Sequence, residues 1–169
     1  MVQFRKARPG DAEALARASE RAFHSDIHCG APGIGGPPGY NSAAWQARMM
    51  RLGDYYTIVA QGQIVGGIIV FRQGTRQYEL GRIFVDPDLQ NQGIGTQAFD
   101  FLWETYPLAR RWTLGTPAWN RRTRHLYKKV GFVEIGEDGH GGILFERRVP
   151  GPAPAPAGES AEDAPARAE

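Results

Sequence analysis

The segment from Leu80 to Thr96 holds the residue pattern with the clearest chemical use. An apolar run typical of a buried strand leads into a polar turn around Pro87 and then into Gln-x-x-Gly-x-Gly, which begins at Gln90. Glycines at such a turn let the backbone approach a ligand closely, and the free N–H groups of a first helical turn favour a phosphate or pyrophosphate. The pattern therefore predicts a phosphate site between a strand and a helix.

Other glycine-rich phosphate motifs fit this sequence less well. Counted from Gly93, the third glycine position of a dinucleotide-binding fingerprint is Ala98, which is tolerated. No strand ending in Asp or Glu follows about 20 residues later, as that fingerprint requires. The Gly/Pro-rich run from Gly30 to Gly39 is a loop and not a P-loop, because no Gly-Lys-Ser/Thr follows it. The alternative is that Gly93 and Gly95 only allow a tight turn between the strand and the helix.

The elements that must position this segment follow from hydrophobic periodicity and from chain breakers. The predicted order is β-α-α-β-β-β-α-β-α-β-β, a mixed α/β domain without an internal repeat. Strands are expected at 2–7, 55–60, 64–71, 77–85, 111–115, 132–135 and 142–149. Helices are expected from the cap Asp11 through Phe23, from a cap at Asn41 or Ser42 through Leu52, from about Gly95 to Tyr106, and from Arg121 to Val130. The pair Gly66-Gly67 indicates a bulge or close packing.

The amino-acid composition limits the kinds of fold and site that these elements can form. Hydrophobic residues make up 41% of the 169 residues, which is enough for one folded core. The single cysteine, Cys29, excludes an intramolecular disulfide and a cysteine-based zinc site, and the four histidines show no metal-ligand spacing. We therefore expect no metal. Since neither a membrane-spanning run nor a secretory signal is visible, a cytoplasmic location is expected.

The charge is unevenly distributed along the chain. Residues 150–169 contain 12 Pro or Ala and carry one basic side chain against four acidic ones. Residues 1–149 then carry 19 basic and 14 acidic side chains, a formal charge of +5. A Pro/Ala-rich segment has no large apolar side chain to bury. We expect one folded domain at 1–149 followed by a disordered acidic tail at 150–169.

Three motifs in this order resemble the GNAT superfamily of N-acetyltransferases. Its acetyl-CoA motif is Arg/Gln-x-x-Gly-x-Gly/Ala, preceded by Ile-x-Val-x-Pro and followed later by Asn, Tyr and Gly-Phe. The matching residues are Gln90, Gly93 and Gly95, the preceding Ile83, Val85 and Pro87, and the later Asn120, Tyr127, Gly131 and Phe132. The resemblance covers about residues 2–149. It implies a mixed, mostly antiparallel central sheet flanked by helices, with a splayed strand pair for acetyl-CoA.

The resemblance also implies roles for single residues. Backbone groups of Ile83, Phe84 and Val85 would pair with the pantetheine arm of acetyl-CoA. Asn120 would hydrogen-bond the pantetheine or acetyl end, and Tyr127 would protonate the departing thiolate. The amides expected to hold the pyrophosphate are those of Gln90, Asn91, Gln92, Gly93, Ile94, Gly95 and Thr96.

An amine acceptor must lose a proton before it attacks, because an alkyl amine has a pKa of about 10.4. Glu79 is the predicted general base: it precedes Ile83 by four residues, so a regular strand would place both on one face. A surface or salt-bridged Glu79 is the alternative. In the GNAT fold the segment joining the first two helices borders the acceptor pocket. Asp26 or Tyr40 in that segment is predicted to contact a cationic amine, unless the segment is only a solvent loop.

The predicted function is an acetyl-CoA-dependent N-acetyltransferase, which moves the acetyl group to a primary amine of a small molecule or peptide by direct attack in a ternary complex. One alternative is a catalytically weak acyl-CoA-binding sensor. Another is a nucleic-acid-binding module that uses the basic helix at 121–129, but a charge of +5 is small for it. Arginines of that helix could instead hold the 3′-phosphate of CoA. Neither nucleic acid nor membrane is expected as a partner, and a homodimer is possible.

Overall fold

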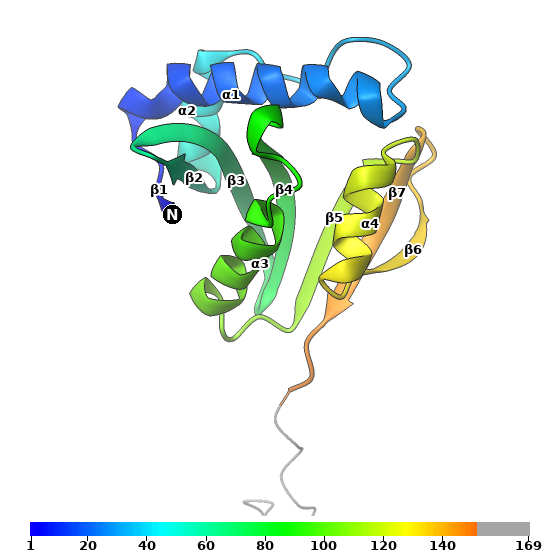
Figure 1. The fold of residues 1–169 in the computed structure, drawn as a ribbon. Helices are drawn as coiled ribbons and strands as arrows, with labels where there is room; N and C mark the ends of the chain where they lie inside the picture. Colours follow the sequence, from blue (N-terminus) through cyan, green and yellow to red (C-terminus); the bar gives the residue numbers. More distant parts are fainter. Residues whose placement is uncertain (152–169) are drawn as a thin grey trace, which may run out of the picture.

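A computed structural model describes residues 1–151 and shows one seven-stranded sheet with four α-helices (Figure 1). Its spatial strand order is β1-β2-β3-β4-β5-β7-β6, and only the β4–β5 pair is parallel. The strands are β1 (Val2–Lys6), β2 (Asp54–Ala60), β3 (Gln63–Gly74), β4 (Gln77–Val85), β5 (Arg111–Pro117), β6 (Val133–Glu137) and β7 (Gly142–Arg148). The helices are α1 (Ala12–His24), α2 (Ala43–Leu52), α3 (Ile94–Thr105) and α4 (Arg121–Lys129). The predicted mixed, mostly antiparallel architecture and the element order are confirmed.

Local chain signals explain where the first two helices begin. Ser42 is the N-cap of α2, and its hydroxyl accepts a hydrogen bond from the Trp45 amide at 3.1 Å. Asp11 occupies the predicted N-cap position of α1, but its side chain makes no cap bond there. Its carboxylate instead accepts from the Arg8 amide at 2.8 Å and pairs with the Arg5 guanidinium. The preceding 3₁₀ turn, and not α1, is therefore what Asp11 stabilises.

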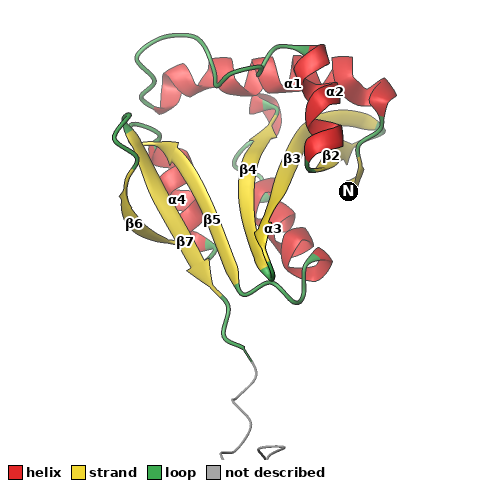
Figure 2. Cartoon of the chain, turned by 180° about the vertical axis from the view of Figure 1, so that it is seen from behind, coloured by secondary structure: helices red, strands yellow, loops and turns green. Residues whose placement is uncertain are grey.

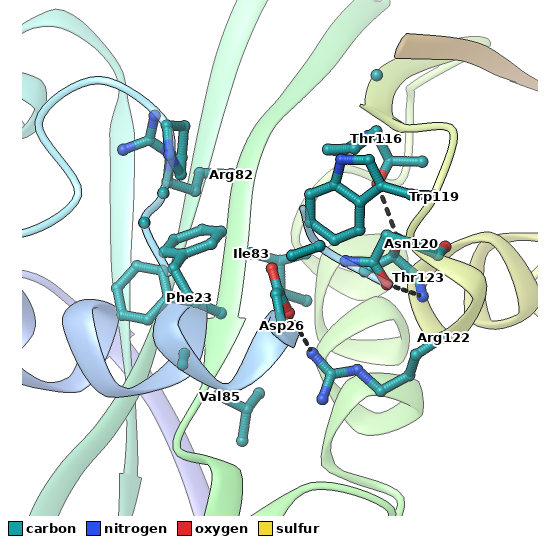
Figure 3. A pocket seen from close by; sticks show the side chains of 18 of the residues that line it. Phe23, Asp26, Arg82, Ile83, Val85, Thr116, Trp119, Asn120, Arg122 and Thr123 are labelled. Atoms are coloured by element: carbon teal, nitrogen blue, oxygen red, sulfur yellow. Dashed lines mark hydrogen bonds and ion pairs between the residues drawn. The ribbon is translucent and has the colours of Figure 1, made fainter. Parts of the chain in front are cut away.

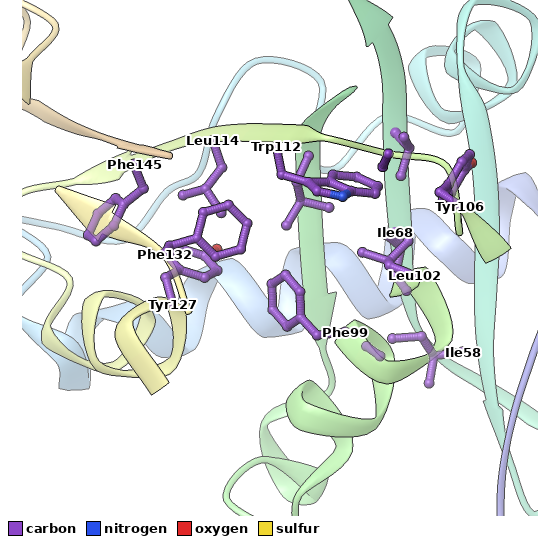
Figure 4. Close-up of a cluster of buried hydrophobic side chains, with 14 of the residues drawn as sticks. Ile58, Ile68, Phe99, Leu102, Tyr106, Trp112, Leu114, Tyr127, Phe132 and Phe145 are labelled. Atoms are coloured by element: carbon purple, nitrogen blue, oxygen red, sulfur yellow. The ribbon is translucent and has the colours of Figure 1, made fainter. Parts of the chain in front are cut away.

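Apolar side chains pack on both faces of the sheet. Along β3, Ile68 and Val70 join a large core under α3 and α4, whereas Ile69 joins a smaller core under α1 and α2. This alternation is the period of two expected for a strand buried on both faces. Figure 4 shows the large core, in which Phe99 and Trp112 are almost fully enclosed. The two cores fix α1 and α4 on opposite sides of the strands that carry the candidate site.

The sheet opens between its two parallel strands. β4 and β5 are paired only where Gln77–Glu79 face Arg111–Thr113, and beyond this point the strands diverge (Figure 2). Within residues 1–151, the part of β4 from Gly81 onward therefore has β3 on one side and no strand on the other. The unpaired edge leaves backbone donors and acceptors free for a ligand. A splayed strand pair was predicted, and the geometry confirms it.

A β-bulge at Gly81 changes the face on which β4 side chains lie. Leu80 is paired with Val70 and Arg82 with Ile69, so Gly81 is one extra residue opposite β3. A Cβ at Gly81 would meet the Phe71 ring, which leaves room for glycine alone. The parity of side chains is therefore opposite on the two sides of this residue.

Within residues 1–151, no helix has the length and apolar character needed to cross a membrane. The last strand ends at Arg148, close to the predicted domain end at 149. The predicted tail at 150–169 falls, from residue 152 on, outside the described residues.

Candidate active site

A cavity of about 600 Å³ occupies the gap between β4 and β5. Its walls come from five parts of the chain: the end of α1 with the following Gly/Pro loop, the outer half of β4, Gln90, the end of β5, and the start of α4 (Figure 3). Residues with polar side chains on this wall are Asp26, Arg82, Gln90, Thr116, Trp119, Asn120, Arg122, Thr123 and Tyr127. The opening of the parallel pair thus becomes a binding cavity.

The Gln-x-x-Gly-x-Gly segment, here called the phosphate turn (90–96), starts α3 beside this cavity. Asn91 and Gly93 have positive φ values of 61° and 82°, and Gly93 is the N-cap. Because the first intrahelical bond runs from the Gln97 amide to the Gly93 carbonyl, the amides of Ile94, Gly95 and Thr96 have no acceptor within the helix. These N–H groups and the helix dipole would favour an anion at this position. Of the predicted pyrophosphate residues, Gln90 alone is part of the described cavity wall, whereas Gln92 and Ile94 line a second, separate pocket.

Tyr127 is held rigidly by the large core. Its ring lies edge-on to Phe99, Phe132 and Phe145, with centroids 6.0, 6.2 and 5.8 Å away. Within the described residues the hydroxyl has no hydrogen-bond partner, yet it is not among the fully enclosed polar atoms. It therefore opens into the cavity that Tyr127 lines. Burial raises the pKa of Tyr127 well above its ordinary value, so the hydroxyl keeps its proton.

Asn120, Asp26 and Arg122 meet at one end of the cavity. Asn120 is the N-cap of α4, and its Oδ1 accepts from the Thr123 amide at 3.1 Å. Arg122 Nη2 lies 3.2 Å from Asp26 Oδ1, and Arg122 Nη1 donates to the Gln90 side chain (Figure 3). Burial raises the pKa of Asp26, while Arg122 and Asn120 oppose that rise. Arg122 therefore joins the phosphate turn, α4 and the end of α1.

The chain matches a known family over the strands and helices that build this cavity. Residues 52–134, which run from the end of α2 to β6, match the family model described as the acetyltransferase (GNAT) domain. The chain carries a GNAT acetyltransferase domain. This confirms the resemblance inferred from the three motifs. The segment covers β4, β5, α3 and α4, so every wall of the cavity except the α1 end and the Gly/Pro loop lies within it.

Solved structures share this fold at low sequence identity. The PaiA N-acetyltransferase of Thermoplasma acidophilum, solved in complex with coenzyme A, superimposes with a TM-score of 0.73 at 16% identity, over 88% of this chain and 99% of that one. An acetyltransferase of Thermus thermophilus gives 0.74 at 14% identity, over 88% and 97%. The ribosomal-protein-S18-alanine N-acetyltransferase of Escherichia coli gives 0.70 at 18% identity, over 92% and 99%.

Among curated proteins, the uncharacterized protein YrkN of Bacillus subtilis (strain 168) is 33% identical over 89 residues. This match covers 50% of the present chain and 48% of YrkN. The chain thus spans about half the length of the curated relative that it matches.

The bulge at Gly81 corrects the geometry expected for Glu79. Glu79 lies opposite Phe71 and Ile83 opposite Ile68, and these two β3 residues face opposite cores. Glu79 and Ile83 therefore do not share a face, because the extra residue between them inverts the alternation. Glu79 is not part of the described cavity wall, and its carboxylate accepts a hydrogen bond from Gln73 at 2.7 Å.

The segment between α1 and α2 borders the cavity through Asp26 and the Gly/Pro loop, as expected, but Tyr40 is not part of the described wall. The Tyr40 hydroxyl lies 2.9 Å from His24 Nε2, and the ring packs edge-on against Phe23 at 6.1 Å. Tyr40 therefore supports the loop from outside the cavity. Sequence reasoning missed Arg82, because the bulge that turns it toward the Gly/Pro loop leaves no signal beyond Gly81.

Three of the five Lys and Arg side chains of α4 form ion pairs within the described residues, which leaves Arg121 and Lys129 without one. Arg124 and Lys128 both pair with Glu134, at 2.8 and 3.2 Å, and Arg122 pairs with Asp26. Phosphate binding along a duplex needs several unpaired cations in a row. This pairing weighs against the nucleic-acid alternative and against Arg124 as a ligand of the 3′-phosphate.

Proposed function

We propose that this protein transfers an acetyl group from acetyl-CoA to a primary amine by direct attack in a ternary complex. The observation that carries the proposal is a cavity whose wall holds Tyr127 and Gln90, the first residue of the phosphate turn, inside a GNAT domain. When bound, acetyl-CoA would supply an activated acetyl group whose leaving group is a thiolate.

The free edge of β4 and the start of α3 are the groups that fit this co-substrate. Backbone groups of Ile83–Val85 are the proposed partners of the pantetheine amides, although the Val85 carbonyl already accepts a hydrogen bond from Gln90 Nε2 at 2.9 Å. Amides from Gln90 to Thr96 are the proposed ligands of the pyrophosphate, with Arg122 beside Gln90 as an added cation. Asn120 uses its carbonyl oxygen to cap α4, and its amide nitrogen, which also interacts with Asp26, is the proposed donor toward the thioester end.

Tyr127 is the proposed proton donor to the departing thiolate. Its raised pKa keeps the phenol protonated, and the packed ring holds the hydroxyl in place without a competing partner among the described residues. Asp26 is the one carboxylate in the cavity wall that the described residues form, and it is the proposed contact of the acceptor amine. A carboxylate with a raised pKa is also better suited to accept a proton from that amine.

Thiol release from acetyl-CoA, measured with a panel of amino acids, polyamines and peptides, tests this function. Amine-dependent release that is lowered about 100-fold in Tyr127→Phe is the expected result. Calorimetric titration with coenzyme A supplies the independent binding measurement. Tight binding without turnover of any amine would favour the acyl-CoA sensor, and absence of both would reject the proposal.

A further inference from the structure

Arg82 is a cation in the cavity wall with no acidic partner among the described residues. Its guanidinium lies over the Trp45 ring at 4.1 Å and 5.8 Å from the centre of the Phe23 ring. Nη2 donates to the Pro38 carbonyl at 3.2 Å, whereas Nη1 is enclosed and has no hydrogen-bond partner within residues 1–151. Burial lowers the pKa of Arg82 to about 10, which still leaves it charged near neutral pH.

The nearest titratable groups do not neutralise this charge. Tyr55 stays protonated, because burial raises its pKa, and its hydroxyl donates to Gln46. Asp26, the one carboxylate in the described cavity wall, is already paired with Arg122. That wall therefore holds two guanidinium groups and one carboxylate, and the excess positive charge sits at Arg82.

The strand geometry separates Arg82 from the groups proposed to bind the co-substrate. Beyond the bulge, Ile83 and Val85 pack toward the core under α3 and α4, whereas Phe84 packs toward α1 and α2. Arg82 shares the face of Phe84, and Figure 3 shows it beside Phe23, across Ile83 from Asp26 and Arg122. The proposed co-substrate groups and Arg82 thus lie on different sides of one strand.

We propose that the acceptor is a small molecule that carries an oxyanion, a carboxylate first of all, together with its amine, and that Arg82 binds the oxyanion. The inference rests on the acetyltransferase function proposed above and names its substrate class. A carboxylate that takes the place of the Pro38 carbonyl accepts from Nη2 and Nη1 together, the two-pronged arrangement that suits a guanidinium. The amine of the same molecule is left for Asp26. Amino acids fit this pattern, and polyamines do not.

The test compares acceptors that differ only in the anion. Each amino acid that is acetylated is paired with its decarboxylated amine, for instance phenylalanine with phenethylamine and lysine with cadaverine. β-Alanine, 2-aminoethylphosphonate and propylamine form a further set that separates carboxylate from phosphonate. In the unaltered protein we expect kcat/KM to be about 10- to 100-fold higher for the anionic member, the range for a hydrogen bond to a charged group.

Arg82→Met should raise the KM of the anionic acceptor about 10- to 100-fold and leave its decarboxylated partner nearly unchanged. Arg82→Lys keeps the positive charge but loses the two-pronged hydrogen bonding of the guanidinium, so it should retain part of the preference for anionic acceptors. The matched control is Arg147→Met: Arg147 lies over Trp103 at 4.0 Å and its pKa is also lowered by burial, but it is not in the described cavity wall. This control should leave the acceptor preference unchanged.

A second measurement, inhibition by carboxylates, uses the unaltered protein and so does not require that any variant fold. Carboxylates without an amine, such as 3-phenylpropionate, should inhibit competitively against the amine acceptor and not against acetyl-CoA. Amine turnover without a preference for the anionic acceptors, or the same preference in Arg82→Met, would overturn the role of Arg82 while the acetyltransferase function stands. Failure of every amine to be acetylated would reject that function and the substrate class with it.

Discussion

The guanidinium of Arg122 lies 3.2 Å from the carboxylate of Asp26, although the two residues are 96 positions apart in the chain. Arg122 lies in the first turn of α4, Asp26 follows α1, and the same guanidinium donates to Gln90 of the phosphate turn. One side chain thus connects the proposed co-substrate end of the cavity with the carboxylate proposed for the acceptor. An anion bound at the turn competes with Asp26 for this cation.

Arg122→Met should weaken binding of coenzyme A about 10-fold or more, because a hydrogen bond between charged groups is worth about 1.5–3 kcal/mol. Calorimetric titration measures the change. Arg124→Met is the matched control: it lies on the same helix but pairs with Glu134 and the Ala118 carbonyl. Equal losses in the two variants would contradict a specific role for Arg122.

Tyr127→Phe keeps the aromatic packing and removes the hydroxyl alone, so kcat should fall about 100-fold with little change in stability. Since burial raises the pKa of Tyr127, the unaltered enzyme should lose no Tyr127-dependent activity as the pH passes about 10, where an ordinary tyrosine would ionise. A pH–rate profile of both proteins measures whether activity is lost in this range. A fall in the activity of the unaltered enzyme at about pH 10 that is absent from Tyr127→Phe would contradict a raised pKa of Tyr127.

Gly93→Ala should weaken coenzyme A binding, because φ at Gly93 is +82° and a Cβ there is strained by about 1 kcal/mol whatever the space around it. Gly62→Ala is the control: φ is +75° with open space, in the turn between β2 and β3. Both variants should lower the melting temperature by a similar amount. Only Gly93→Ala should raise the KM for acetyl-CoA.

Asp26→Asn should lower kcat/KM for the acceptor about 10-fold, because it removes the charge proposed to contact the amine. Glu79→Gln should leave kcat/KM nearly unchanged, since Glu79 is outside the described cavity wall and bonds to Gln73. Initial rates at saturating acetyl-CoA measure both. A large loss in Glu79→Gln with none in Asp26→Asn would restore Glu79 as the base.

Prediction from sequence succeeded where neighbours along the chain decide the outcome. Pro87 follows the end of β4 at Val85, Gly93 permits the turn into α3, and Ser42 caps α2 as expected. It failed where one residue changes the register. The bulge at Gly81 cannot be recognised from a lone glycine, so the prediction that Glu79 and Ile83 share a face was wrong.

By itself, the sequence determined the order of strands and helices, because this order depends on local periodicity and breakers. It also singled out the turn at 90–96 and Tyr127 as candidates, through short motifs that resemble a family. Only the tertiary structure decided that Arg122 pairs with Asp26 and that Arg82 faces the Gly/Pro loop without an acidic partner among the described residues. The reason is physical: ion pairing and burial depend on groups brought together across the fold, and no local pattern records which of them will meet.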